Sequence, residues 1–149
     1  MLTTSPTPSA TDVASHLRLV VARTARRLRQ EAGADLSPSL TSALASIDRH
    51  GPLTPSELAG HERVQRPTAT RLLTRLTELG LVERAADPAD RRSALISTSA
   101  AGRALLRRLR TRKNQYLAQH LAALEPDELA TLDRAAAILE RMLDLGDRR

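Results

Sequence analysis

One segment near the middle of the chain constrains the fold more than any other. It begins with Thr-Pro-Ser-Glu at 54–57, a capping box with proline at the first helical position, which predicts a short helix. Residues 66–79 then carry apolar side chains at helical spacing until Gly80 ends the pattern. Two short strands are expected at 81–85 and 93–97, joined by a polar turn that is too long for a two-residue hairpin loop. The segment therefore predicts two helices followed by a β-hairpin.

Helical patterns flank this segment on both sides. A first helix is expected over about 12–31 and a second from 37 to 50, each with apolar side chains at helical spacing. After the hairpin, a long helix is expected over about 100–123 and a last one from 125 onward. The residues at 1–10, rich in Thr, Ser and Pro, are expected to form a disordered lead.

The composition favours a helical core and a polyanionic partner. The chain has 149 residues, 41% of them apolar, and Tyr116 is its only Phe, Trp or Tyr, so aliphatic side chains must fill the interior. The formal net charge is +6, which favours nucleic acid as a partner. Genomic base composition can enrich arginine without any function, so the positions of the arginines must decide.

The absence of cysteine excludes several kinds of chemistry. A chain without cysteine has no disulfide, no thiolate zinc site and no thiol redox sensor. The N-terminus lacks a basic region followed by an apolar run, and no run approaches the roughly 18 apolar residues of a membrane span. A cytoplasmic protein is expected.

The order of the elements predicts the architecture. A short capped helix, a turn, a second helix with a polar outer face and a β-hairpin follow one another in a winged helix-turn-helix. We therefore expect a mainly α fold with a small β-hairpin wing. The expected parts are a winged helix-turn-helix DNA-binding region at 35–99 and a helical region made of 11–34 and 100–149. The helical region is expected to serve dimerisation, because its apolar faces exceed what a small winged domain can cover.

The helix at 66–79 is the expected reader of DNA. On a 100° wheel its buried face is centred on Leu72, Leu73 and Leu76. Arg71, on the opposite side, can bond guanine, and two threonines beside it offer short, adaptable hydroxyls. An ordinary solvated helix face is the alternative, which the position between a capped helix and a hairpin argues against. The polar side consists of Pro67, Thr70, Arg71 and Thr74, and it is flanked by Arg66 and Arg75 as expected phosphate contacts.

The hairpin turn ends in Asp90, Arg91 and Arg92. The Asp90 carboxylate can brace one guanidinium while the other projects from the tip. An arginine placed in this way suits a narrow minor groove. The alternative is an ordinary exposed turn, which is polar because turns in general are polar, and which has no contact with DNA.

Four blocks of sequence carry a resemblance to a known family. They are Arg-Pro-Thr-Ala-Thr-Arg-Leu-Leu at 66–73, Leu-Gly-Leu-Val-Glu-Arg at 79–84, Asp-Pro-Ala-Asp-Arg-Arg at 87–92 and Ser-Ala-Ala-Gly at 99–102. With these blocks, the chain resembles the MarR family of bacterial regulators over nearly all of its length after residue 10.

The resemblance implies a recognition helix at 65–80, a wing at 86–92, and dimerisation through the first, fifth and sixth helices. It also implies a homodimer that binds palindromic double-stranded DNA and acts as a transcriptional repressor, released by a small anionic or phenolic effector. Gln65 stands where the family often has a Ser or Asp helix cap, and glutamine caps poorly. The DNA-binding residues assigned in this way are Gln65, Arg66, Pro67, Thr68, Thr70, Arg71, Thr74, Arg75, Arg91 and Arg92.

Other functions meet specific objections. An enzyme would need a nucleophile, an acid–base pair or a metal set, and we find no phosphate-cradling glycine loop or clustered histidines, so no catalytic residue or cofactor is expected. Surfaces for RNA or single strands stack bases on aromatic side chains, of which this chain has one. A constitutive architectural DNA binder without an effector remains open. No metal site is expected because no pair shows ligand spacing on one helix among His16, His50, His61 and His120.

The helix at 100–123 has a basic run of its own. The run could touch DNA, but a solvated helix face is the expected role. Tyr116 on the same helix is expected to be an ordinary packed tyrosine, and no ligand-binding residue is assigned. The run consists of Arg107, Arg108, Arg110, Arg112 and Lys113.

Overall fold

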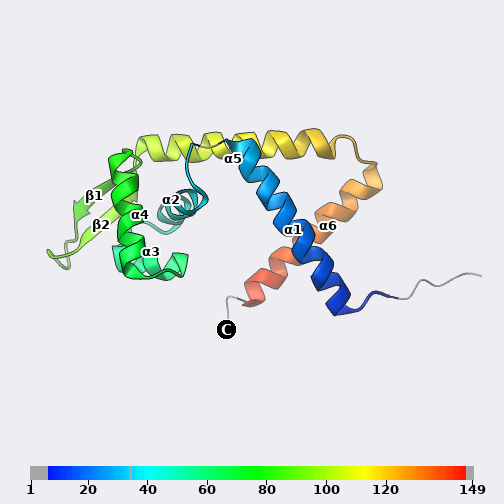
Figure 1. Ribbon diagram of the computed structural model, residues 1–149, viewed down its shortest axis with the longest axis horizontal. Helices are drawn as coiled ribbons and strands as arrows, with labels where there is room; N and C mark the ends of the chain where they lie inside the picture. Colours follow the sequence, from blue (N-terminus) through cyan, green and yellow to red (C-terminus); the bar gives the residue numbers. More distant parts are fainter. Residues whose placement is uncertain (1–6, 34, 147–149) are drawn as a thin grey trace, which may run out of the picture. The chain divides into compact units, whose positions relative to one another are not determined.

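The computed structural model describes residues 7–33 and 35–146 (Figure 1). The chain is mainly helical with one β-hairpin, which confirms the expected fold class. The elements lie close to their expected ranges. They are α1 (Ala10–Ala32), α2 (Pro38–His50), α3 (Pro55–Glu62), α4 (Arg66–Glu78), β1 (Val82–Ala86), β2 (Ala94–Thr98), α5 (Ala100–Leu121) and α6 (Pro126–Gly146).

The start of α1 falls within the segment expected to be a disordered lead. Residues 1–6 of that segment lie outside the described residues. Ala10 is the first residue of α1, and the side chain of Ser9 caps the helix by accepting a hydrogen bond from the Asp12 amide at 3.2 Å.

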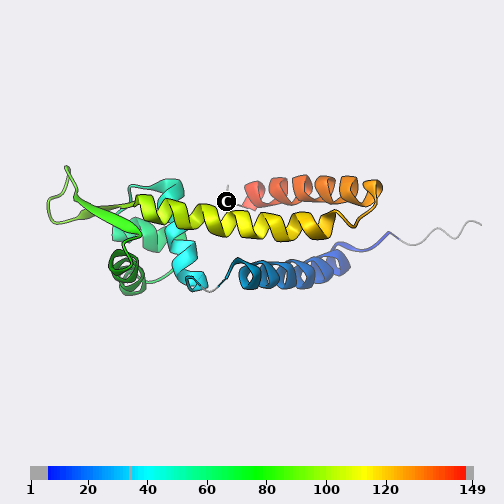
Figure 2. The same ribbon diagram turned by 90° about the horizontal axis from the view of Figure 1, so that it is seen from above.

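The described residues form two compact units that divide between Lys113 and Asn114. In the first unit, α2, α3 and α4 pack together, and the hairpin extends away from them in both views (Figures 1 and 2). The Leu and Ile side chains at the centre of this cluster are almost inaccessible to solvent, so aliphatic packing fixes the relative positions of the three helices. The fully buried large side chains are Leu44, Ile47, Leu58, Leu73, Leu76 and Ile96.

The hairpin is tied to the helices through Leu53. β1 and β2 pair antiparallel, with Val82 opposite Thr98 at the base of the hairpin. Leu53, just before α3, forms an isolated β-bridge with Ile96. The Leu53 amide donates to the Ile96 carbonyl oxygen at 2.9 Å, and the Ile96 amide donates to the Leu53 carbonyl oxygen at 2.8 Å. The chain just before α3 and the middle of β2 therefore hold each other in place.

Ser99 joins the end of α4 to the start of α5. Its hydroxyl donates to the carbonyl oxygen of Gly80 at 2.7 Å and accepts from the amide of Gly102 at 3.0 Å. The Ser99 amide also donates to the Leu81 carbonyl oxygen at 3.0 Å. These bonds set the position of the hairpin between α4 and α5.

Large apolar side chains are exposed mainly on two helices. Among the described residues, every exposed large apolar side chain except Leu79 belongs to α1 or α6. No described helix is both long and apolar enough to cross a membrane. The exposed set consists of Val13, Leu17, Leu19, Val20 and Val21 on α1, Leu79, and Leu129, Leu132, Ile138, Met142 and Leu143 on α6.

Candidate nucleic-acid interface

The expected capping box fixes the start of α3. The Thr54 amide donates to the Glu57 carboxylate at 2.7 Å, and the Glu57 amide donates to the Thr54 hydroxyl oxygen at 3.3 Å. The hydrogen bonds from the backbone and side chain of Thr54 lower the pKa of Glu57, because they favour its ionised form. The first helix of the helix-turn-helix therefore begins at a defined residue.

A left-handed residue makes the turn between α3 and α4. Arg63 has φ 52° and ψ 42°, and the following Val64 amide donates to the Ala59 carbonyl oxygen at 3.0 Å. This closes α3 and redirects the chain within three residues. Leu58 of α3 and Leu73 of α4 then lie in one buried cluster, so α3 fixes which side of α4 faces outward.

The structure places the expected reading residues on the exposed side of α4. Ala69, Leu73 and Leu76 form its buried side, while Leu72 is half-buried. The apolar stripe ends earlier than expected, because the helix ends at Glu78 and Leu79 is 41% exposed. Gln65 makes no side-chain cap bond, as expected for glutamine. The exposed residues of the set are Gln65, Arg66, Pro67, Thr70, Arg71, Thr74 and Arg75, whereas Thr68 is half-buried.

The threonine hydroxyls on this face are not free to adapt. Thr70 donates to the Arg66 carbonyl oxygen and Thr74 to the Thr70 carbonyl oxygen, each at 3.0 Å. The expectation of adaptable hydroxyl donors is therefore wrong for this structure, because the helix backbone one turn earlier already accepts both protons.

Arg71 and Arg75 of α4 differ in their surroundings. Arg71 has one long contact, from its guanidinium to the Thr68 hydroxyl oxygen at 3.4 Å, and keeps most of its donors available. Arg75 pairs with the Glu78 carboxylate at 3.0 Å, with both side chains more than half exposed. A phosphate bound by Arg75 must compete with this carboxylate, and salt bridges of such exposed groups are weak.

The wing tip is shaped by two carboxylates that bind the backbone. Asp87 accepts from the Ala89 amide, and Asp90 accepts from the Arg92 amide, both at 2.9 Å. Asp90 was expected to brace a guanidinium; instead its Oδ1 accepts from the Arg92 backbone amide, and no ion pair of Asp90 is found among the described residues. Arg91 and Arg92 are both exposed, and no ion pair among the described residues involves either one. Their guanidinium groups are therefore available to an anion.

Part of the basic run on α5 has a structural role. Arg112 donates to the Ala32 carbonyl oxygen at 2.8 Å and to the Asp35 carboxylate at 3.2 Å, and Arg108 lies 3.9 Å from the same carboxylate. Arg112 therefore links α5 to the end of α1 and to Asp35, and Arg108 adds a longer contact to Asp35. Sequence reasoning missed this pairing because Asp35 lies far from both arginines along the chain.

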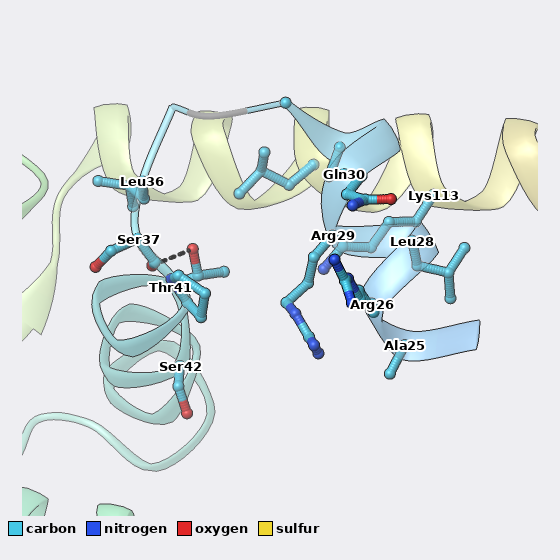
Figure 3. Close-up of a pocket in the computed structure, with 14 residues that line it drawn as sticks. Ala25, Arg26, Leu28, Arg29, Gln30, Leu36, Ser37, Thr41, Ser42 and Lys113 are labelled. Carbon is cyan, nitrogen blue, oxygen red and sulfur yellow. Dashed lines mark hydrogen bonds between the residues drawn. The ribbon is translucent and has the colours of Figure 1, made fainter. Parts of the chain in front are cut away.

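A cavity of about 700 Å³ lies among the end of α1, the start of α2 and α5 (Figure 3). Its lining combines the cationic side chains of Arg26, Arg29 and Lys113 with apolar and hydroxyl groups, and Arg29 extends into the space between α1 and α2 (Figure 3). The sequence assigned no ligand-binding residue, since the lining residues come from three separate segments. The apolar and hydroxyl-bearing lining residues include Leu28, Leu36, Leu109, Ser37, Thr41 and Ser42.

The histidines do not gather into a metal centre. His50 and His61 stack with ring centroids 4.3 Å apart, and His120 lies beside Tyr116 with centroids 4.2 Å apart. In the part of the chain that the structure describes, no three His, Cys, Asp or Glu side chains form a group that could hold a metal ion.

Residues 36–94, which hold the helix-turn-helix and most of the hairpin, match the model of the MarR family. Over 133 residues the chain is 37% identical to an HTH-type transcriptional regulator of Mycobacterium bovis, covering 89% of this chain and 93% of that protein. Over 100 residues it is 35% identical to the multiple antibiotic resistance protein MarR of Salmonella typhimurium, covering 66% of this chain and 69% of that protein. This chain belongs to the MarR family.

MarR-family membership gives the helix-turn-helix its general role. The chain is a DNA-binding transcriptional regulator, and the family consists of regulators rather than enzymes. The crystal structure of a Pseudomonas aeruginosa protein assigned as a transcriptional regulator has a TM-score of 0.81 and 37% identity, covering 93% of this chain and 98% of that one. A mutant of MepR from S. aureus, bound to an oligodeoxyribonucleotide, shares the fold at a TM-score of 0.67 and 20% identity, covering 89% of this chain and 96% of that one.

Proposed function

We propose that this chain is a cytoplasmic homodimer that binds a palindromic DNA operator and represses the adjacent genes until a small anionic or phenolic ligand releases it. The observation that carries the proposal is the exposed position of Arg71 on a helix whose opposite side is fixed in the core. A rigid helix with an accessible guanidinium is suited to reading guanine in the major groove. The oligodeoxyribonucleotide bound to MepR, which has this fold, supports the same use of the fold here.

The proposed contacts divide into readers and phosphate binders. Arg71 reads a base edge, with Thr70 and Thr74 beside it on the helix. Arg91 and Arg92 bind in or beside the minor groove from the wing tip, where their guanidinium groups have no ion pair with a described residue. The remaining residues of the proposed interface orient the helix or hold phosphates, and they are Gln65, Arg66, Pro67, Thr68 and Arg75.

The proposed dimer rests on the exposed apolar side chains of the terminal helices. Val20 on α1 is 44% exposed, and Ile138 and Met142 on α6 are each 55% exposed. Large apolar side chains that a helix leaves exposed are typical of an interface. We assign dimerisation to 11–34 and 100–149 and DNA binding to 35–99, with the two readers about 34–36 Å apart on symmetric half-sites.

The proposed effector site is the cavity shown in Figure 3. Its three cationic side chains favour an anion, and its leucines favour an apolar body. The cavity wall includes the start of α2, which belongs to the proposed DNA-binding region, and the end of α1, which belongs to the proposed dimerisation region. A ligand that fills the cavity can therefore change the position of the readers, and DNA must then weaken the ligand by the same factor.

Operator selection tests the DNA-binding part of the proposal. The full-length chain is incubated with random duplexes in the presence of a nonspecific duplex competitor, and the bound sequences are read. We expect a palindromic consensus. Retention of all duplexes with equal affinity would instead support a constitutive architectural DNA binder.

A ligand titration tests the effector part. Benzoate and 4-hydroxybenzoate serve as probes, and a probe at about 100 times its dissociation constant should stabilise the free protein by about 2.7 kcal/mol. The same probe should lower operator affinity. Arg29→Gln should weaken probe binding, whereas Arg23→Gln on the same helix, outside the cavity lining, serves as the matched control. If every stabilising probe leaves operator affinity unchanged, the effector role fails.

A further inference from the structure

The two threonines of the proposed reading face, Thr70 and Thr74, donate their hydroxyl protons within the helix. A threonine hydroxyl has one proton to donate, and it can accept through its lone pairs. In Thr70 and Thr74 that proton goes to a backbone carbonyl oxygen one turn earlier, at 3.0 Å in each case. Donation to a base would require breaking an existing hydrogen bond on the helix.

The same hydrogen bonds hold the side chains in one orientation. Threonine is branched at Cβ and therefore stiff about its first side-chain torsion, and the bond to the i−4 carbonyl selects one rotamer. With Oγ1 directed along the helix toward its own backbone, the γ-methyl occupies a defined position on an exposed residue. Thr70 and Thr74 are four residues apart, so they lie on one side of the helix.

We infer that Thr70 and Thr74 determine part of the operator sequence by packing their γ-methyl groups against the 5-methyl groups of thymine. Thymine is the only standard base of DNA that presents a methyl group in the major groove, and an apolar contact with it discriminates that base. The inference deepens the proposed function and depends on α4 lying in the major groove. Arg71, between the two threonines, then supplies the hydrogen-bond donors.

A third threonine provides an internal comparison. Thr77 makes the same type of bond, to the Leu73 carbonyl oxygen at 2.7 Å. It lies on the last turn of α4, whereas base contacts of a recognition helix come mainly from its N-terminal part. Changes at Thr77 therefore control for general effects of removing a methyl or a hydroxyl from this helix.

The test uses the selected operator with single thymines replaced by deoxyuridine, which lacks only the 5-methyl group. Wild-type protein is expected to lose about fourfold in affinity at one or two thymines of each half-site, the effect of about one buried methyl group. Affinity is measured for the full-length protein on each duplex at one fixed salt concentration.

Paired substitutions then separate the methyl from the hydroxyl. Thr70→Ser and Thr74→Ser keep the hydroxyl and lose the methyl, so each should stop distinguishing thymine from deoxyuridine at its position. Thr70→Val and Thr74→Val keep the methyl, so each should retain the preference of about fourfold for thymine whatever its overall affinity. Thr77→Ser should leave the preference as in the wild-type protein. Because serine, valine and threonine have similar helix propensities and the sites are exposed, these variants are expected to fold.

The outcomes distinguish this inference from the proposed function. If no sequence is selected, the proposed function fails and the inference fails with it. If an operator is selected but deoxyuridine binds as well as thymine at every position, only the inference fails. Loss of the thymine preference in the valine variants together with its retention in the serine variants would show that the γ-methyl groups of Thr70 and Thr74 do not contact the thymine methyl groups, and would also overturn it.

Discussion

Gly102 and Leu81 approach so closely that a β-carbon at position 102 would lie 2.2 Å from the carbonyl oxygen of Leu81. The same β-carbon would lie 2.8 Å from the γ-methyl of Thr98. The first turn of α5 thus packs directly on the backbone between α4 and the hairpin. Only glycine fits there, and the position of the wing relative to the reading helix depends on this contact.

Gly102→Ala is expected to lower the free energy of unfolding by about 1–3 kcal/mol, because the added methyl meets backbone that must shift. Gly60→Ala in α3 is the matched control, since a β-carbon there would meet nothing within 4 Å. That control should be neutral or stabilising by up to about 1 kcal/mol. Urea unfolding measures both variants. Equal stability of Gly102→Ala and wild type would show that the contact is not tight.

The Thr54–Glu57 capping box predicts a pH dependence of stability. The hydrogen bonds from Thr54 lower the folded-state pKa of Glu57 below its ordinary value of 4.5. Ionised Glu57 therefore stabilises the fold above about pH 4.5, and this contribution is lost as the pH falls through the lowered folded-state pKa. The melting temperature of wild type should exceed that of Glu57→Gln at neutral pH, and the difference should shrink in acid. An equal difference at pH 7 and pH 3 would contradict this.

The exposed arginines of the wing tip predict how operator affinity depends on salt concentration. Replacing both Arg91 and Arg92 by alanine should lower operator affinity and flatten the dependence on salt, since each lost phosphate contact removes about 0.9 from the log–log slope. Glu83→Gln on β1 is a control of the same hairpin that leaves both guanidinium groups in place. Affinities between 50 and 200 mM salt, approximately, give the slope. An unchanged slope would remove the wing tip from the interface.

The exposed apolar side chains of α1 and α6 predict a dimer. Val20→Glu and Leu132→Glu should shift the protein to a monomer and weaken operator binding, because a buried charge opposes association. Leu79→Ser is the control for oligomeric state, since Leu79 is the exposed large apolar residue of the described chain that lies outside both helices. Analytical ultracentrifugation reports the mass. A charged variant that stays dimeric would place the interface elsewhere, and a monomeric variant with full operator affinity would separate binding from dimerisation.

Periodicity and caps were sufficient to predict the order of the helices and strands, although α1 begins within the segment expected to be disordered. The helix around Leu73 and the capping box at Thr54 depend on contacts within a few residues, which a sequence displays directly. The order of these elements then predicted the fold class, and the exposed side of α4 followed from the spacing of its leucines.

The sequence did not predict how polar groups choose among partners. Thr70 was expected to offer its hydroxyl to DNA, and Asp90 was expected to brace a guanidinium. Each side chain instead forms a hydrogen bond with the nearby backbone, which depends on the rotamer and on the turn geometry. The cavity and the Arg112–Asp35 pair also went unpredicted, because they join segments that lie far apart in the sequence. The reason for glycine at position 102 likewise needed the position of the Leu81 carbonyl oxygen.

We propose above all that the exposed side of α4 reads DNA sequence through Arg71. Operator selection repeated with Arg71→Ala and with Arg75→Ala tests it most directly. Arg71→Ala should weaken operator binding by about 1–3 kcal/mol and relax the preference at one base position in each half-site. Arg75→Ala should weaken all duplexes alike, because it removes a proposed phosphate contact that carries no base information; the Arg75 guanidinium also pairs with the Glu78 carboxylate. A selected sequence that is unchanged by Arg71→Ala would show that another surface reads the operator.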